Sequence, residues 1–145
     1  MATRTATTTW TGDLQSGSGD VELTSSKVGT YEVSWPRRTA DEAGGTTSPE
    51  ELLAAAHSSC FARAFSGQLA RAGGSNARLT VRADVTIGPD PAGGFRISTS
   101  KLTVRGSVDG LDDDGFVKAA EEAKVGCPVS KALTGLEISL DAALG

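Results

Sequence analysis

Residues 48–74, SPEELLAAAHSSCFARAFSGQLARAGG, contain every signal of one complete helix. The opening Ser-Pro-Glu-Glu places a hydroxyl at the N-cap, proline at the first helical position and glutamate at the third, a combination typical of a helix start. The Gly-Gly pair at 73–74 supplies a C-terminal stop. The sequence therefore predicts a helix that runs to about Ala72, about 36 Å long at about 1.5 Å per residue.

The segments on both sides of this helix alternate between apolar and polar residues, which indicates half-buried strands. After the helix, the alternation changes phase between Ile97 and Leu102, so we expect a bulge or a bend there. We predict an antiparallel sheet in the N-terminal third and a second antiparallel segment after the helix. The alternating residues are Val21 and Leu23, then Tyr31, Val33 and Trp35, and after the helix Leu79, Val81, Ala83, Val85, Ile87, Phe95, Ile97, Leu102 and Val104.

The C-terminal part of the chain predicts two more helices and a strand. Three aspartates at 112–114 open a helix that Gly126 closes, and Cys127 with Pro128 forms the N-cap and first position of another short helix. Alternation over residues 136–140 predicts a closing strand. We therefore expect an α+β fold in a single domain over residues 1–145, without internal repeats or linkers.

The composition limits the function classes. The chain has 145 residues, of which 38% are hydrophobic and 5% aromatic, and its net charge is −4. This length fits one domain, and the scarcity of large side chains leaves a thin core that favours oligomerisation. A net negative charge provides no broad basic surface, so we expect no nucleic-acid partner.

No segment has the length or hydropathy of a targeting or membrane signal. The first ten residues are polar and rich in threonine, and the longest aliphatic run is Leu52–Ala56. We expect a cytoplasmic protein without membrane contact. Two cysteines and the single His57 lack metal-ligand spacing, and the glycine-rich stretches lack nucleotide-binding fingerprints, so we expect no metal and no bound cofactor.

The two cysteines are the candidate chemical groups. Cys60 shares a helix stripe with Leu53 and Ala64, so a small buried core residue is one interpretation. Cys127 starts a helix, where free N–H groups and the helix dipole lower the pKa of a thiol. A plain N-cap role for Cys127 is the alternative.

His57 lies three residues before Cys60, so both side chains lie near one helix face. A Cys/His pair could act in a cysteine hydrolase. However, a cysteine in the middle of a helix has no free backbone N–H groups nearby for an oxyanion hole. The sequence therefore favours a packing or pocket role for His57.

Two segments carry a family resemblance. Residues 48–61 and residues 123–130, AKVGCPVS, resemble the paired cysteine motifs of the OsmC/Ohr family of thiol-dependent peroxidases. Residues 10–13 and 33–38 resemble the N-terminal sheet of the same family. His57 before the first cysteine and the Cys-Pro-Val-Ser run are similar to the OsmC branch. The resemblance implies antiparallel sheets wrapped around a long central helix in an intertwined homodimer.

The resemblance also implies a reaction. The family reduces organic hydroperoxides, and hydrogen peroxide more weakly, in oxidative stress defence. By this resemblance Cys60 attacks the peroxide and becomes a sulfenate, and Cys127 resolves it as a disulfide before further oxidation traps the enzyme. A small dithiol or a lipoyl-bearing protein then reduces the disulfide.

Two charged residues complete the site that the resemblance implies. The family places an arginine against the attacking thiol and a glutamate against that arginine. The matching residues in this sequence are Arg38 and Glu50, and the adjacent Arg37 is the alternative to Arg38. Glu50 and Cys60 are ten residues apart on one helix, about 15 Å along its axis, too far for one guanidinium to touch both in one chain. We therefore expect a homodimer with antiparallel long helices, in which Glu50 of one chain approaches Cys60 of the other. Glu50 as a simple partner of the helix dipole remains an alternative.

An apolar entrance could favour alkyl hydroperoxides over hydrogen peroxide. For each residue in this entrance, ordinary core packing is the alternative. The alternative function is a redox sensor or a small-molecule-binding module, which would use the same cysteines without sustained turnover. The candidate entrance residues are Leu52, Leu53, Phe61, Phe65 and Val129.

Overall fold

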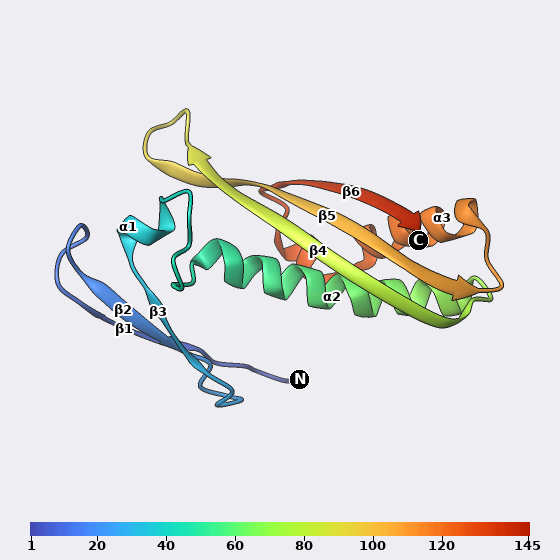
Figure 1. Cartoon of the computed structure of the whole chain (residues 1–145), viewed down its shortest axis with the longest axis horizontal. Helices are drawn as coiled ribbons and strands as arrows, with labels where there is room; N and C mark the ends of the chain where they lie inside the picture. Colours follow the sequence, from blue (N-terminus) through green and yellow to red (C-terminus); the bar gives the residue numbers. More distant parts are fainter. The chain divides into compact units, whose positions relative to one another are not determined.

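The computed structural model describes residues 1–145 as two compact units, residues 1–52 and residues 53–145. Each unit contains one three-stranded sheet (Figure 1). Helices and sheets occur in separate segments of the chain, which confirms the α+β expectation. The single-domain expectation stays a prediction.

The first unit is built on an antiparallel meander. It consists of β1 (Thr7–Thr11), β2 (Ser18–Glu22) and β3 (Thr30–Val33), in the order β1-β2-β3. Along β2 the side chains alternate between buried and exposed, with Val21 buried, as the alternating pattern predicts. The antiparallel N-terminal sheet is thus confirmed.

Trp35 differs from the expectation. Instead of continuing a strand, it begins the short helix α1 (Trp35–Arg38), which Ser34 precedes as N-cap. Pro36 explains the change, since proline has no N–H to donate to a sheet ladder and its fixed φ suits the first turn of a helix. The guanidinium of Arg38 lies 5.8 Å from the centroid of the Trp35 ring.

The long helix forms as predicted. α2 spans Pro49–Arg71, and the Ser48 hydroxyl accepts a hydrogen bond of 3.2 Å from the Glu51 amide. At its end Gly73 adopts a φ of 94°, a conformation that side chains disfavour, and the Gly74 amide donates to the Leu69 carbonyl. The cap and the glycine stop therefore set both ends of α2.

The second unit contains a three-stranded sheet in the order β4-β5-β6. Its strands are β4 (Ser75–Pro89), β5 (Phe95–Asp109) and β6 (Glu137–Leu144). The antiparallel register of β4 and β5 shifts where Thr86 pairs with Thr99 and Ile87 with Ile97. The shift lies where the alternation changes phase, so the predicted bulge is confirmed.

β5 and β6 pair in parallel, which differs from the antiparallel sheets that the resemblance implied. Between them the chain forms α3 (Asp113–Gly126) and α4 (Pro128–Ala132), and this crossover returns the chain to the same end of the sheet (Figure 1). The Asp112 side chain accepts a bond of 2.8 Å from the Gly115 amide, and Cys127 is the N-cap of α4, as expected. Both caps lie where the sequence predicts them.

The core of the second unit joins α2, β5 and α3. The Phe65 ring contacts two other phenylalanines, with centroid distances of 5.6 Å to Phe61 and 4.9 Å to Phe116. The second contact is edge-to-face, which suits the charge distribution of aromatic rings. Cys127 is fully buried within this cluster. The buried members are Phe61, Phe65, Leu69, Leu102, Val104, Phe116, Ala119, Ala120, Ala123 and Cys127.

We predict that Phe116→Ala lowers the free energy of unfolding by about 3–5 kcal/mol, because it removes a fully buried ring and leaves a cavity. Val117→Ala, one position along the same helix, is the matched control, since Val117 is 40% exposed, and we expect a change within about 0.5 kcal/mol. Urea denaturation of the three proteins measures both effects. Equal losses in the two variants would contradict the core described above.

Candidate functional site

The second unit brings the two cysteines together. Cys60 comes from the middle of α2 and Cys127 from the start of α4, and both are free thiols. Each side chain forms a hydrogen-bonding interaction with the other. The pairing of thiols far apart in the sequence therefore arises from the packing of α2 against α3 and α4.

Cys127 has surroundings that favour its thiolate. Burial acts to raise the pKa of Cys127, but hydrogen bonding from the Ser130 amide, the Cys60 thiol and the Ser130 hydroxyl outweighs burial and lowers the pKa. Its side chain makes no regular capping hydrogen bond, and α4 has only five residues. The lowered pKa thus comes from donors in the first turn of α4 and from Cys60, and its direction agrees with the sequence expectation.

Cys60 has the opposite tendency. Burial raises the pKa of the Cys60 thiol, and the adjacent Cys127 raises it further. The Val129 amide and the positive charge of Arg63 act against this rise without overcoming it. Within one chain, therefore, Cys127 is the more acidic thiol, whereas Cys60 is the more accessible one.

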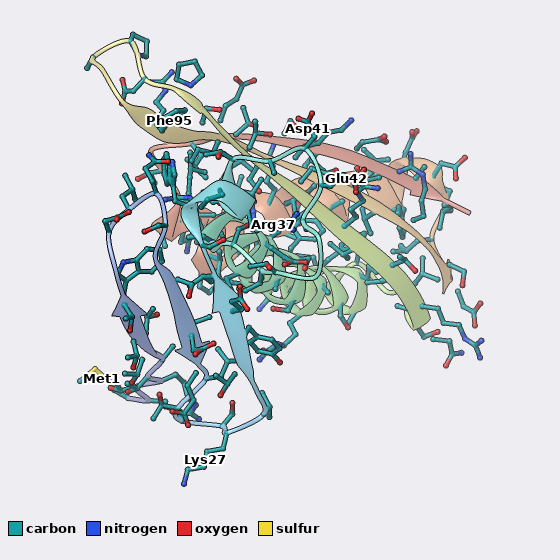
Figure 2. All side chains as sticks on the ribbon, turned by 60° about the vertical axis from the view of Figure 1, so that its left-hand side comes forward. Met1, Lys27, Arg37, Asp41, Glu42 and Phe95 are labelled. Atoms are coloured by element: carbon teal, nitrogen blue, oxygen red, sulfur yellow. The ribbon has the colours of Figure 1, made fainter.

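Arg38 and Glu50 form a bidentate ion pair in the first unit. Arg38 Nη2 lies 2.8 Å from Glu50 Oε1, and Arg38 Nε lies 3.1 Å from Oε1 and 3.3 Å from Oε2. The Glu50 side chain is only 8% exposed and that of Arg38 is 29% exposed. Arg37 instead turns toward the loop of residues 39–47 (Figure 2), where its guanidinium lies next to Gly44. Of the two adjacent arginines, Arg38 is thus the one that contacts Glu50.

An apolar pocket lies beside this ion pair in the first unit. Its volume is about 230 Å³. No sequence pattern predicted the pocket, because its two tryptophans, Trp10 and Trp35, lie 25 positions apart in the chain. The lining residues are Trp10, Leu14, Val33, Ser34, Trp35, Arg38 and Pro49.

The five residues expected at an apolar entrance lie in different environments. Phe61 and Phe65 are fully buried in the core, which agrees with the core-packing alternative. Leu52 and Leu53 are half-buried, and Val129 packs against the edge of the core. An entrance role for these residues stays a prediction.

His57 is fully buried and bonded through both ring nitrogens. Nδ1 lies 2.7 Å from the Ser100 hydroxyl and Nε2 lies 2.9 Å from the Ser130 hydroxyl. Burial lowers the pKa of His57, so the ring is neutral at neutral pH. This agrees with the packing role and not with a hydrolase pair. Sequence reasoning missed both serines, although Ser130 stands in the Cys-Pro-Val-Ser run.

No group of three or more histidine, cysteine, aspartate or glutamate side chains converges in a way that could hold a metal ion. None of the helices combines the length and the hydropathy needed to cross a membrane.

We predict that acid destabilises the protein through His57. Because folding lowers the His57 pKa, the unfolded chain binds a proton as the pH falls through about 6.5 while the folded chain does not, so the free energy of unfolding decreases by up to about 1.4 kcal/mol per pH unit. Above that pH the contribution is fully present. Urea denaturation at several pH values measures the slope, and His57→Gln, which does not titrate, should flatten it. An unchanged slope in this variant would show that other groups cause the acid sensitivity.

Comparison with known proteins gives one consistent family. The family model described as OsmC-like protein matches residues 41–141. Peroxiredoxin OsmC of Escherichia coli (strain K12) is 37% identical over 132 residues, which cover 91% of this chain and 90% of that protein.

Solved structures agree with this result. The organic hydroperoxide resistance protein of Elizabethkingia anophelis has a TM-score of 0.77 at 28% identity, covering 100% of this chain and 98% of that one. OhrB of Bacillus subtilis, also an organic hydroperoxide resistance protein, has a TM-score of 0.74 at 25% identity, covering 97% and 98%. These likenesses confirm the expected fold class, and together with the family match and the adjacent thiols they show that this chain belongs to the OsmC family.

Proposed function

We propose that this chain is a thiol peroxidase that reduces organic hydroperoxides, and hydrogen peroxide more weakly, in oxidative stress defence. The observation that carries the proposal is the contact between the free thiols of Cys60 and Cys127 inside the second unit. Relatives named peroxiredoxin and organic hydroperoxide resistance protein support it.

The proposed reaction uses both thiols in turn. The Cys60 thiolate attacks one peroxide oxygen, the O–O bond breaks, and the alcohol leaves with a proton from solvent, so that Cys60 becomes a sulfenic acid. The Cys127 sulfur then attacks the Cys60 sulfur, the S–O bond breaks, and water leaves as the disulfide forms. A dithiol or a lipoyl-bearing protein reduces the disulfide and restores both thiols.

Accessibility supports Cys60 as the attacking thiol. Cys60 is half-buried and can meet a peroxide, whereas Cys127 is fully buried. Because burial raises the pKa of Cys60, fast attack needs a cation beside it. The positive charge of Arg63 on the same helix stabilises the Cys60 thiolate in part. We assign the larger part of this stabilisation to an arginine that a carboxylate holds in place, in the way that Glu50 holds Arg38.

We further propose that the active protein is a homodimer, with each chain folding as one domain. Along α2, the ten residues from Glu50 to Cys60 correspond to about 15 Å, so an Arg38 fixed on Glu50 cannot also reach Cys60 of its own chain. A second chain with its α2 antiparallel would place its own Arg38 and Glu50 beside this Cys60.

The apolar pocket suits the carbon part of an organic hydroperoxide. It is lined mainly by apolar side chains, including two tryptophan rings, and the guanidinium of Arg38 stands in its wall. We assign to Arg38 the peroxide oxygens and to the pocket the alkyl or aryl group. The half-buried Leu52, Leu53 and Val129 remain candidates for the entrance to the site.

One observation favours the alternative function of a redox sensor. The pKa of Cys60 is raised in the single chain, which is typical of a slowly oxidised thiol. Slow oxidation by one equivalent of peroxide without sustained turnover would support the sensor and contradict the peroxidase.

We predict fast consumption of an organic hydroperoxide, and slower consumption of hydrogen peroxide, with dihydrolipoamide as reductant. Cys60→Ser should abolish turnover, because no sulfenate can form. Cys127→Ser should allow about one round before over-oxidation, because no thiol remains to resolve the sulfenate. Peroxide consumption and the mass of the oxidised protein measure both. If Cys127→Ser blocks the first oxidation and Cys60→Ser does not, the two roles are reversed.

We predict that one slowed variant and one inactive variant complement each other. Arg38→Ala should slow the first attack by about tenfold or more, because the thiol loses its cation, and Cys60→Ser should be inactive. In an equal mixture of subunits, mixed dimers would combine Arg38 from one chain with Cys60 from the other and restore about a quarter of the wild-type sites. Co-expression with two different tags allows the mixed dimer to be purified and assayed. Activity no higher than that of the Arg38→Ala protein would show that both residues act within one chain.

A further inference from the structure

The buried side chain of His57 connects to the site through Ser130, and the peroxidase reaction described above leaves it unused. Nε2 of His57 lies 2.9 Å from the Ser130 hydroxyl, and the same hydroxyl interacts with the Cys127 sulfur. On the other side, Nδ1 lies 2.7 Å from the Ser100 hydroxyl. The four side chains thus form one network of contacts. Its order is Ser100 from β5, His57 from α2, Ser130 from α4 and Cys127 from the N-cap of α4.

This network of contacts lies in the interior of the second unit. Ser100, His57 and Cys127 are fully buried and Ser130 is 7% exposed. No buried side-chain nitrogen or oxygen lacks a hydrogen-bond partner. Because solvent is excluded, each proton in the network has to be placed by the side chains themselves.

Counting protons gives the network a direction. The Ser130 hydroxyl has one proton, so when it donates to the Cys127 sulfur it must accept from His57 Nε2. A neutral imidazole has one N–H, so Nδ1 is then unprotonated and accepts from the Ser100 hydroxyl. Both hydroxyl donors and the ring N–H consequently point toward Cys127.

We propose that His57 is a positioning residue for Cys127: its Nε2–H donates to the Ser130 oxygen and thereby holds the Ser130 hydroxyl proton toward the Cys127 sulfur. A thiolate at Cys127 then has a hydroxyl donor as well as backbone donors. The opposite ring tautomer would draw the Ser130 proton to Nε2 and leave the Cys127 sulfur without this donor.

The consequence for catalysis rests on the proposed function. When the Cys127 thiolate attacks the Cys60 sulfenic acid, the S–S bond forms, the S–O bond breaks, and the hydroxide that leaves takes a proton from solvent to become water. The sulfenic sulfur is reduced and the Cys127 sulfur is oxidised, so the step needs no other oxidant. His57 speeds this step by favouring the Cys127 thiolate before the sulfenate appears.

Other charged groups near the thiols are few. Arg63 on α2 acts on Cys60, and the thiols act on each other. Lys124 near the end of α3 and Lys131 on α4 flank Cys127 along the chain. Arg63, Lys124 and Lys131 are unchanged in the variants below, and the titrated proteins all carry the same replacement of Cys60, so the influence of these groups is constant across the titration series.

The first measurement is the tautomer of His57 by nitrogen NMR. His57 is the only histidine in the chain, so labelling with ¹⁵N-histidine gives the signals of this ring alone. We expect a protonated Nε2 and an unprotonated Nδ1 at neutral pH. A protonated Nδ1 would overturn the proposal, and the measurement needs no variant, so it decides even where a variant fails to fold.

The second measurement titrates Cys127 alone. In a Cys60→Ser background Cys127 is the only thiol, and its ultraviolet thiolate absorbance follows the pH. The matched variants are His57→Gln, whose amide reaches the position of Nε2 and can donate to Ser130, and His57→Asn, whose shorter amide reaches only the position of Nδ1. Ser130→Ala removes the hydroxyl itself.

We expect His57→Asn and Ser130→Ala to lower the thiolate fraction of Cys127 at neutral pH by about tenfold, the effect of one hydrogen bond to a charged group. His57→Gln should stay within about twofold of the histidine protein. Circular dichroism confirms folding of each variant. A thiolate fraction unchanged in folded His57→Asn or Ser130→Ala would overturn the proposal, because a purely structural histidine would not affect the titration.

Neither measurement uses peroxide, so this inference and the proposed function can fail separately. With both cysteines present, one equivalent of organic hydroperoxide allows the delay between sulfenate and disulfide to be measured. We expect the delay to lengthen by about tenfold in His57→Asn and to be restored by His57→Gln. A chain that never consumes peroxide but shows the expected titration would refute the peroxidase and retain the positioning role.

Discussion

The contact of Phe65 with Phe61 and Phe116 is the interaction on which the second unit depends. It holds α2 against α3, and both helices against the sheet strand β5, within a core that has few other large side chains. Cys60 directly precedes Phe61, and Cys127 directly follows the last residue of α3. Packing of these rings therefore brings two distant thiols into contact, and the chemistry of the site is a consequence of how the core is filled.

Burial has opposite effects on the two thiols because their neighbours differ. Cys127 gains hydrogen bonding from Ser130 and Cys60, which is enough to lower its pKa although it is fully buried. Cys60 has no comparable set of donors, since the backbone of a mid-helix residue is already hydrogen-bonded within the helix. The more accessible thiol thus has the higher pKa.

Two buried polar groups are each fully paired. Glu50 accepts from the guanidinium of Arg38 in the first unit, and His57 is bonded through both ring nitrogens in the second. A buried carboxylate or imidazole without partners would be strongly destabilising. Such paired groups keep one geometry, because another arrangement would leave a buried polar group without a partner.

Local signals determined much of this protein from the sequence alone. The caps at Ser48 and Asp112, the glycine stop at 73–74, the N-cap at Cys127 and the phase change after Ile97 all act through residues within a few positions of one another. Local sequence therefore predicts the three helices that these caps begin and the bulge, and the motif resemblance correctly indicated the family.

Only the tertiary structure decided the rest. The parallel pairing of β5 with β6, the partners Ser100 and Ser130 of His57, and the raised pKa of Cys60 beside Cys127 depend on residues far apart in the chain. The prediction of a strand at Trp35 was wrong, because it followed the alternation with Val33 and ignored Pro36, which favours the start of a helix. Alternation and caps specify local backbone conformation. The pKa of a buried thiol, the order of strands and the partners of a buried side chain depend instead on which surfaces pack together in the folded chain, and no local pattern specifies that packing.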